Sequence, residues 1–456
     1  MTTSFSVINP YSNTVLNEYR YDSWGAVENR INRLRQGQQI QRKLTAFSRA
    51  DILRNLAVLI TENADELALL ITRETGKTIS DSRVEIVRAT NTAIASSEES
   101  RQITGETLDS DAYTPARSRI GVVCWRPLGT VLCITPFNFP INIAMHKIGP
   151  AFAAGNCILF KPNPQNIVSS RFLVDLCYRA GIPEDTLQLV MPAISDMSKV
   201  IAHPDINAVN FTGGTEAAAE IAKAAGYKKL LFELGGNDAL IVMADGDVSS
   251  AVNAAINQRF ATAGQRCTAA KRLFIHASVY DEFREKLLEA TRNLKVGNPE
   301  AGDTFLGPVI NSLAADAIQQ RIADALAQGA TLLLGGQREG NIIYPTILED
   351  VPDNCTIVKD ETFGPVMPLR RFDDIAELIE VINGTPFGLQ AGVFTNDMRL
   401  MRRLFEELEV GTLATNDGPG FRAEHFPFGG VKQSGIGREG VKYAIREMSF
   451  QKTLVL

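Results

Sequence analysis

The feature that most constrains the fold is a regular alternation of short apolar runs with helical patterns between Gly129 and Gly226. Four of the apolar runs have the composition of buried strands, and they are GTVLCIT, CILFKP, LQLVMP and INAVNFTGG. A segment with apolar residues at helical spacing follows each of them. Strands that alternate with helices in this way form a parallel sheet whose two faces are covered by helices. The pattern therefore predicts an α/β fold with a doubly wound, Rossmann-like sheet of the nucleotide-binding type.

The segments on either side of this region predict further elements. Residues 48–103 have helical spacing, and the stretch TPARSRIGVVCWRPLGT at 114–130 favours a β-hairpin or an extended arm. A second α/β region begins near Lys229, and its first long helix leads directly to Cys267. The last eight residues, SFQKTLVL, indicate a strand with nothing after it to pair with. We therefore expect that strand to complete a sheet in another subunit.

Length and composition exclude several classes of protein. A chain of 456 residues is too long for one compact core, so two or three domains are expected. The net charge of -6 argues against a nucleic-acid partner. The first residues, MTTSFSVINPYSN, do not have the pattern of a signal peptide, and no apolar stretch reaches membrane-spanning length. We therefore expect no membrane association and a cytoplasmic enzyme.

The cysteines and histidines are informative mainly through one residue. Six cysteines are dispersed without a C-x-x-C pair, which is typical of buried, reduced core thiols. Cys267 is the exception, for reasons given below. The four histidines do not have metal-ligand spacing, so no metal is expected.

Two glycine-rich segments compete for the role of a dinucleotide-binding turn. Residues 435–440 match G-x-G-x-x-G, but no apolar strand precedes them and only 16 residues follow, which leaves no room for a βαβ unit. We expect a glycine-rich turn near the active site or a subunit contact there. The segment Phe211–Thr215 is the better candidate, because it ends a predicted strand and opens a helix. Its two glycines allow close backbone approach, and a helix N-terminus favours pyrophosphate.

Three further residues form a chemical constellation. Glu233 lies in Phe-Glu-Leu-Gly-Gly, Cys267 lies 34 residues later in Gly-Gln-Arg-Cys, and Asn138 ends the first strand of the parallel sheet. The set resembles the aldehyde dehydrogenase superfamily, and the resemblance covers essentially the whole chain. The supporting motifs occur in the expected order, and they are Ala154-Gly155-Asn156, Lys161-Pro162, the Gly213-Gly214 turn, Glu-Thr-Phe-Gly-Pro at 361–365 and Pro-Phe-Gly-Gly-Val-Lys-Gln-Ser-Gly at 427–435.

The resemblance implies a mechanism that uses NAD or NADP. Cys267 would add to the aldehyde as a thiolate, which requires a lowered pKa or a nearby base because a free thiol has a pKa of about 8.5. The Asn138 amide and the Cys267 backbone N–H would hold the oxyanion, where losing one donor costs about 3 kcal/mol. Glu233 would act as the general base that hydrolyses the thioester.

The resemblance also implies coenzyme contacts. Lys161 would hydrogen-bond the adenosine ribose, and Glu361 would bind the nicotinamide ribose with Phe363 beside it. The remaining expected coenzyme contacts are Thr135, Pro136, Phe137, Gly213, Gly214 and Leu234. Many NAD-preferring members have an acidic residue where this chain has Pro164, and Gly214 replaces a frequent Ser. The preference between NAD and NADP stays open.

Four arginines suggest the substrate class. Arg266 directly precedes Cys267, Arg422 precedes the Pro-Phe-Gly-Gly turn, and Arg83 and Arg88 lie on a helix that borders the substrate tunnel in the family. Arginine suits phosphonate, phosphate or carboxylate groups. We expect a short anionic aldehyde of the phosphonoacetaldehyde, glyceraldehyde 3-phosphate or lactaldehyde type, while surface ion pairs explain the arginines equally well.

Other functions and a domain division follow from the same analysis. The alternatives are a succinic-semialdehyde-like dehydrogenase, a CoA-acylating enzyme, a cofactor-free thiol hydrolase and a non-catalytic binding protein. We expect a coenzyme domain (1–110 and 130–233), a catalytic domain (234–419), and an oligomerisation arm with a C-terminal tail (111–129 and 420–456). The family implies a homodimer or a homotetramer.

Overall fold

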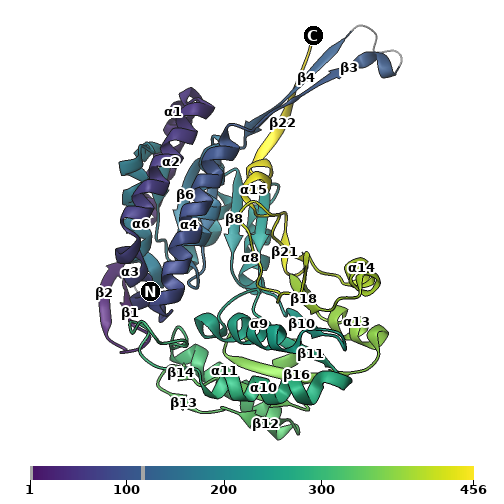
Figure 1. Ribbon diagram of the computed structural model, residues 1–456. Coiled ribbons are helices and arrows are strands. Elements are labelled where there is room, and N and C mark those ends of the chain that lie inside the picture. The colour runs from purple at the N-terminus through teal and green to yellow at the C-terminus, as the bar shows by residue number, and fades with distance from the viewer. Residues whose placement is uncertain (1–3, 114–118) are drawn as a thin grey trace.

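The computed structural model describes residues 4–113 and 119–456. Two large sheets form the body of the molecule, and a small third sheet projects from it as an arm (Figure 1). The chain passes from the first large sheet to the second after residue 233 and returns to the first near its C-terminus. No helix among the described residues is long and apolar enough to cross a membrane.

The first large sheet has six strands in the order β21-β9-β8-β5-β6-β7, all parallel to their neighbours except β21. Its strands are β5 (Thr130–Ile134), β6 (Cys157–Lys161), β7 (Leu187–Leu189), β8 (Ala208–Thr212), β9 (Lys229–Glu233) and β21 (Gly435–Ile436). The helices packed on it are α1 (Trp24–Lys43), α2 (Ala46–Glu62), α3 (Ala64–Thr75), α4 (Ile79–Ser100), α5 (Pro140–Ala154), α6 (Ile167–Ala180), α7 (Met197–Ala202), α8 (Thr215–Ala225) and α15 (Val441–Glu447).

Both faces of this sheet are buried, which explains why its strands are almost wholly apolar. Along β5, Val131 and Cys133 pack into the core beneath α2 to α6 and α15. The alternate residues Leu132 and Ile134 pack against α1, α7 and α8 on the other face. The side-chain alternation of one strand therefore supplies two separate cores.

The second large sheet has seven strands in the order β12-β15-β16-β11-β10-β18-β19. They are β10 (Ala239–Val242), β11 (Arg272–His276), β12 (Thr331–Leu334), β15 (Thr346–Glu349), β16 (Val366–Phe372), β18 (Gln390–Phe394) and β19 (Thr412–Thr415). One face carries α9 (Val248–Phe260), α10 (Tyr280–Arg292), α11 (Ser312–Ala327) and α12 (Thr356–Lys359). The other face carries α13 (Ile375–Asn383) and α14 (Met398–Glu407).

The arm is a three-stranded antiparallel sheet in the order β22-β4-β3. Its strands are β3 (Glu106–Asp109), β4 (Ile120–Pro127) and β22 (Ser449–Val455). Three two-stranded sheets complete the chain, and their strands are β1 (Ser4–Ile8), β2 (Val15–Arg20), β13 (Arg338–Glu339), β14 (Ile342–Ile343), β17 (Phe387–Gly388) and β20 (Val431–Lys432).

The predicted α/β class and the parallel Rossmann-like sheet are confirmed. The helical segment expected at 48–103 consists of three helices, α2, α3 and α4. The sequence analysis predicted no elements at the positions of β1, β2 and α1. Four cysteines, Cys133, Cys157, Cys177 and Cys355, are buried as expected, while Cys124 on β4 is only half-buried.

The terminal strand has one partner within the same chain, because Ser449 to Val455 pair with Pro127 to Gly121 on β4. It is the edge strand of the arm sheet, so its pairing with a sheet of another subunit stays a prediction. The tip of the predicted hairpin, 114–118, lies outside the described residues. The domain boundaries stay a prediction, although β21 places part of the expected tail on the coenzyme sheet rather than in the arm.

Candidate active site

The loop that carries Cys267 is held in an uncommon backbone conformation. After α9 the chain makes a short 3-10 turn (Ala261–Gly264), in which Thr262, Ala263 and Gly264 have φ values of 55°, 53° and 70°. Residues other than glycine rarely adopt this region, and such strain persists only where the surroundings fix it. Asp81 on α4 supplies that constraint, because its Oδ2 accepts hydrogen bonds from the Thr262 N–H (3.0 Å) and hydroxyl (3.3 Å).

Cys267 is partly exposed and lies among charged groups. Lys271 Nζ donates to the Cys267 carbonyl oxygen and pairs with Glu361 Oε1 at 3.0 Å. Burial raises the pKa of the Cys267 thiol to about 11, although Lys271 and Arg422 act in the opposite direction. Of the two requirements that the sequence left open, a lowered pKa or a nearby base, the structure does not show the lowered pKa, because desolvation of the thiolate outweighs the two cations.

Asn138 and Gln265 connect the coenzyme sheet to the Cys267 loop. Asn138 follows β5, is 5% exposed, and its Nδ2 donates to the Gln265 carbonyl oxygen at 2.9 Å. Gln265 in turn accepts a hydrogen bond from the Ile310 N–H at 2.9 Å. No described residue accepts a hydrogen bond from the Cys267 backbone N–H. A donor is thus left free next to the thiol.

Glu233 ends β9 and is buried with one unused oxygen. Its Oε1 accepts a hydrogen bond from the Glu439 backbone N–H at 3.3 Å, while Oε2 has no partner among the described residues. Burial, reinforced by the nearby Glu439 carboxylate, raises the pKa of Glu233 well above its ordinary value. A raised pKa with a free oxygen is the property expected of a general base.

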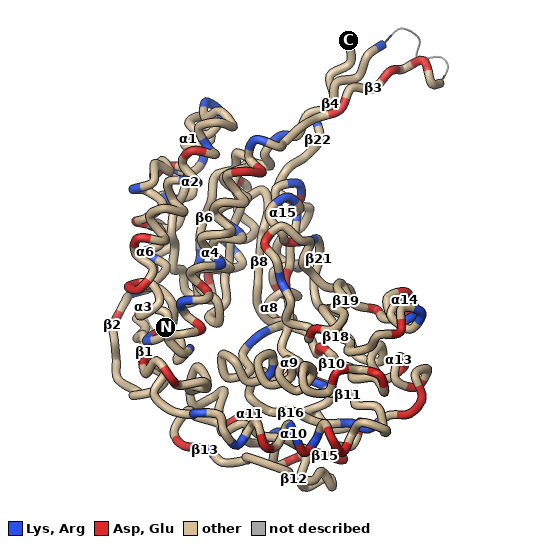
Figure 2. Tube along the Cα trace, in the orientation of Figure 1, with Lys and Arg blue, Asp and Glu red and all other residues tan. Residues whose placement is uncertain are grey.

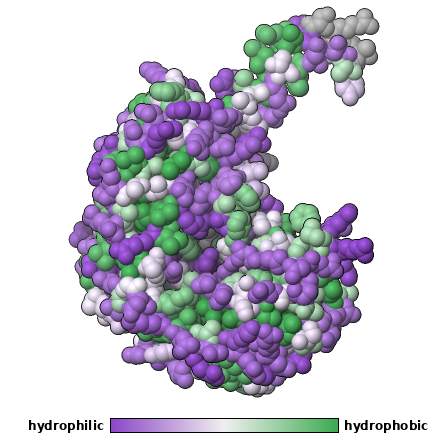
Figure 3. Space-filling view, viewed as in Figure 1, coloured by the Kyte–Doolittle hydropathy of each residue, from purple (hydrophilic) through white to green (hydrophobic). Residues whose placement is uncertain are grey.

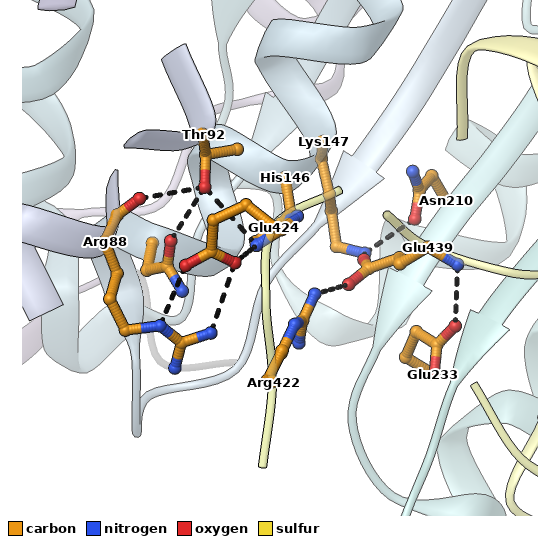
Figure 4. Close-up of polar contacts among 10 residues, drawn as sticks. Arg88, Thr92, His146, Lys147, Asn210, Glu233, Arg422, Glu424 and Glu439 are labelled. Carbon is orange, nitrogen blue, oxygen red and sulfur yellow. Dashed lines mark hydrogen bonds and ion pairs between the residues drawn. The ribbon is translucent and has the colours of Figure 1, made fainter. Parts of the chain in front are cut away.

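Glu439 has the opposite character because two cations flank it (Figure 4). Arg422 Nη2 lies 2.8 Å and Lys147 Nζ 3.1 Å from its carboxylate oxygens. Burial acts to raise the pKa of Glu439, but the two cations outweigh it and lower that pKa. The pKa values of the two carboxyl groups are therefore separated. Glu439 keeps its negative charge, and Glu233 favours the protonated form.

Glycines of two motifs make room for these side chains. A Cβ at Gly235 would collide with Glu361 Oε2, and one at Gly236 would lie 3.0 Å from the Cys267 carbonyl oxygen. A Cβ at Gly429, in the Pro-Phe-Gly-Gly turn, would lie 2.8 Å from Glu233 Oε1. The glycine-rich segment 435–440 also meets this site, because Gly435 pairs with Glu233 across β21 and β9.

The residues expected to bind coenzyme lie at the carboxyl ends of β5, β6 and β8. Gly213 and Gly214 form the turn between β8 and α8, and open space surrounds the position of a Cβ on Gly214. Burial lowers the pKa of the Lys161 ammonium to about 8. The Thr135 hydroxyl is buried without a described partner. An open helix N-terminus and unpartnered polar groups fit a dinucleotide phosphate and ribose.

The remaining expected coenzyme contacts form one group near the predicted nicotinamide position. The rings of Phe137 and Phe363 meet edge to face with centroids 6.0 Å apart. Pro136 lies between Thr135 and Phe137, and Leu234 is buried directly after Glu233. The Glu361 carboxylate accepts from the Gly236 N–H at 3.3 Å, besides its ion pair with Lys271.

The four arginines differ in their partners. Arg83 lies on the exposed side of α4 and pairs with Asp65 at 3.0 Å, so the structure does not bring it to the site. Arg88 forms two hydrogen bonds with Glu424, at 2.9 and 3.3 Å. Arg422 pairs with Glu439 and lies 3.8 Å from the centre of the Phe428 ring. Among the described residues, no hydrogen bond or ion pair engages the Arg266 side chain, although its carbonyl oxygen accepts from the Ala269 N–H at 3.2 Å.

Arg266 nevertheless lies close to Arg88 and Cys267. Burial lowers the pKa of the Arg266 guanidinium, Arg88 lowers it further, and Asp81 and Cys267 act to raise it. Such mutual electrostatic influence requires proximity in a poorly solvated site. A half-buried guanidinium without a counter-ion beside the thiol is suited to an anionic group of a small molecule.

Comparison with known proteins gives the family. The model of the aldehyde dehydrogenase family matches residues 1–454. The chain belongs to the aldehyde dehydrogenase family. The sulfoacetaldehyde dehydrogenase of Neptuniibacter caesariensis is 63% identical over 456 residues, which cover 100% of both chains. The 3-sulfolactaldehyde dehydrogenase of Priestia aryabhattai is 37% identical over 418 residues, 91% of this chain and 88% of that protein.

Solved structures agree with this assignment. The glyceraldehyde-3-phosphate dehydrogenase GapN of Methanocaldococcus jannaschii, complexed with NADP, has a TM-score of 0.95 at 36% identity and covers 99% of this chain and 98% of its own. Similar solved structures hold NADP or NAD+. The protein is an NAD(P)-dependent aldehyde dehydrogenase, as the sequence predicted.

Several residues of this aldehyde dehydrogenase site escaped sequence reasoning. They are Asp81, which fixes the Cys267 loop, Lys271, which ties Cys267 to Glu361, and Lys147, His146 and Glu424 in the buried polar cluster of Figure 4. A signal existed for Lys271, because it lies four residues after Cys267 in Cys-Thr-Ala-Ala-Lys. Asp81 and Glu424 are separated from their partners by hundreds of residues, and no local pattern marks them.

The raised pKa of Cys267 makes its alkylation a sensitive test of the site. Because only the thiolate reacts, the rate of Cys267 modification by iodoacetamide in coenzyme-free enzyme should rise about tenfold per pH unit from pH 7 to 10. Peptide mass spectrometry would follow Cys267 separately from the half-buried Cys124, and Cys267→Ser would give the background. A rate that rises up to about pH 9 and then levels off would show an ordinary thiol pKa and contradict the inferred desolvation.

Proposed function

We propose that this aldehyde dehydrogenase oxidises a short sulfonated aldehyde of the sulfoacetaldehyde type to its carboxylic acid. The observation that carries the proposal is Arg266, the half-buried guanidinium beside Cys267 without a described counter-ion. Arg88 and Arg422 are already neutralised by Glu424 and Glu439, so an arriving anion would pair chiefly with Arg266. The identity of 63% to a sulfoacetaldehyde dehydrogenase supports a sulfonate rather than the phosphonate that the sequence put first.

In the proposed first half of the reaction, Cys267 is the nucleophile. The sulfonate on Arg266 would bring the aldehyde carbon to the thiol, whose proton passes to solvent water as the sulfur adds to the carbonyl carbon. The free N–H of Cys267 and the second Nδ2–H of Asn138 would hold the resulting oxyanion, while the first Nδ2–H stays on the Gln265 carbonyl. NAD(P)+, when bound, supplies the hydride acceptor, and collapse of the oxyanion leaves a thioester on Cys267.

In the second half, Glu233 would activate water. Its unpartnered Oε2 accepts a proton from the water molecule, whose oxygen attacks the thioester carbon. The bond from carbon to the Cys267 sulfur then breaks, and the carboxylic acid leaves. The buried Glu233 carboxyl supports hydrolysis over acyl transfer to CoA, because a CoA-dependent enzyme needs no base for water.

Removing the Arg266 charge should affect sulfonated substrates selectively. In Arg266→Ala, kcat/KM for sulfoacetaldehyde should fall about 10- to 100-fold, the loss of one or two charge-assisted hydrogen bonds. For propionaldehyde the value should change less than about threefold. NAD(P)H formation followed by absorbance gives both numbers, and Arg83→Ala is the matched control because that arginine is exposed and paired with Asp65.

Two outcomes would refute the substrate assignment. Equal losses for both aldehydes would mean that Arg266 only positions Cys267. An unchanged value for sulfoacetaldehyde would mean that the anion binds elsewhere. Phosphonoacetaldehyde, glyceraldehyde 3-phosphate, lactaldehyde and succinic semialdehyde, each with both coenzymes, complete the panel and identify the preferred anion and coenzyme.

Removing the base should separate the two half-reactions. Glu233→Gln should keep a rapid burst of about one NAD(P)H per active site, while steady-state kcat falls about 10²- to 10⁴-fold. Since the pKa of Glu233 is raised and only the carboxylate accepts a proton, wild-type kcat should rise with pH through that pKa. The rise should vanish in Glu233→Gln. Full turnover in the variant, or activity restored by CoA alone, would contradict the role of Glu233 in thioester hydrolysis.

We further propose that the enzyme is a homodimer or homotetramer assembled through the arm. The arm projects from the body and exposes apolar side chains along its strands, Leu108, Ile120, Leu454 and Val455 (Figures 1 and 3). Light scattering after gel filtration should give two or four chains per particle, and Leu454→Glu should reduce that number. Leu313→Glu on α11, where the side chain is even more exposed than that of Leu454, should not. A wild-type particle of one chain would exclude the proposal.

A further inference from the structure

A basic cleft lies at the base of the arm, away from the site described above. It has a volume of about 650 Å³ and runs between the C-terminal ends of α1 and α4, the start of α2 and the strands β4 and β22. Its basic lining residues are Arg42, Arg49, Arg101, Arg126 and Lys452, and none of its lining residues is acidic. Blue positions lie in Figure 2 where the arm leaves the body. This concentration of positive charge occurs in a chain of net charge -6.

Most of these cations have no counter-ion. Arg49 is structural, because its guanidinium donates to the carbonyl oxygens of Ala153 and Leu44, at 3.0 and 2.6 Å. In residues 4–113 and 119–456, no hydrogen bond or ion pair engages the side chains of Arg42, Arg126 or Lys452. Arg101 only lies over the Phe47 ring, at 5.2 Å. Four like charges around one cavity repel one another unless an anion lies between them.

Helix ends explain only half of this charge. Arg42 lies in the last turn of α1 and Arg101 caps the end of α4, where cations are favoured by the helix dipole. Arg126 and Lys452 lie on strands, and no helix end accounts for them. The register pairs Arg126 with Phe450 and Cys124 with Lys452, so the two cations and the Phe450 ring share one face of the arm sheet. Phe450 is 45% exposed.

We propose that this cleft is a second nucleotide site, which binds a nucleoside oligophosphate. The guanidinium and ammonium groups match phosphate oxygens, and the exposed Phe450 ring offers a surface on which a base can stack. The volume lies within the range of small-molecule sites, about 300 to 1,000 Å³. The proposal goes beyond the dehydrogenase reaction and does not depend on its substrate.

The cleft is separate from the coenzyme turn by the topology of the sheet. Gly129 and Gly155 line the cleft. Gly129 lies directly before β5, and Gly155 lies just before β6. Gly213 and Gly214 follow the carboxyl end of β8. Because these strands are parallel, their amino and carboxyl ends lie on opposite edges of the sheet. One dinucleotide therefore cannot occupy both places.

Calorimetry on the full-length enzyme saturated with NADP+ tests the proposal. ADP and ATP, without metal, should bind once per chain, and Arg126→Ala/Lys452→Ala should weaken both at least about tenfold. The double variant Arg402→Ala/Arg403→Ala is the matched control, because it removes the same charge from exposed positions on α14. Its affinity for ADP should match the wild type. Unchanged dehydrogenase activity would show that all proteins are folded.

A second comparison tests the role of the base. Phe450→Ala should weaken ADP binding but leave the affinity for inorganic pyrophosphate unchanged. The proposal is overturned if ADP fails to bind the NADP+-saturated enzyme, if both double variants weaken binding equally, or if pyrophosphate binds as tightly as ADP. It is also overturned if Arg126→Ala/Lys452→Ala alters the number of chains per particle while ADP affinity stays unchanged, since the cleft would then be a contact with another copy.

Discussion

The active site depends on how two buried carboxyl groups are neutralised. Glu233 and Glu439 meet through a backbone hydrogen bond, and both side chains are almost fully buried. Lys147 from α5 and Arg422 from the tail are the only ion-pair partners of Glu439 among the described residues. Removing one partner of such a buried pair typically costs about 3 to 5 kcal/mol, because the remaining charge is left without compensation. The position of the C-terminal tail is therefore fixed by electrostatics as much as by apolar packing.

The carboxylates of the C-terminal tail also determine which arginines of the candidate active site have an ion-pair partner. Arg88 and Arg422 are each satisfied by a glutamate of the tail, Glu424 and Glu439, while Arg266 is left without one. His146 Nε2 donates to the same Glu424 carboxylate at 3.1 Å, so the tail carboxylate is held from two helices (Figure 4). Of these three arginines, only Arg266 has a side chain without an ion-pair partner among the described residues, and a search for arginines in the sequence cannot reveal this difference.

The sequence predicted those parts of the molecule that local patterns encode. The strands of the coenzyme sheet are continuous apolar runs because both of their faces are buried, and the Gly213-Gly214 turn follows directly from a strand end and a helix start. Helix α1 was missed although its buried residues Val27, Ile31 and Leu34 have helical spacing. Only five of its 20 residues are buried, so this apolar signal is sparse. The partner of β22 and the ion pair of Arg88 with Glu424, 336 positions apart, depend on tertiary packing and were beyond local inference. The raised pKa of Cys267 could not be inferred from the sequence for the same reason, because desolvation depends on what surrounds the loop.

The left-handed turn before Cys267 links catalytic competence to the order of folding. Thr262 and Ala263 cannot hold their conformation unaided, and the residue that holds it, Asp81, begins a helix of the N-terminal region. The second large sheet can acquire its own core without that helix, yet the loop would then relax to ordinary backbone angles. In a refolding chain, enzymatic activity consequently requires that the two halves have docked. Activity should therefore return later than the secondary structure of either half.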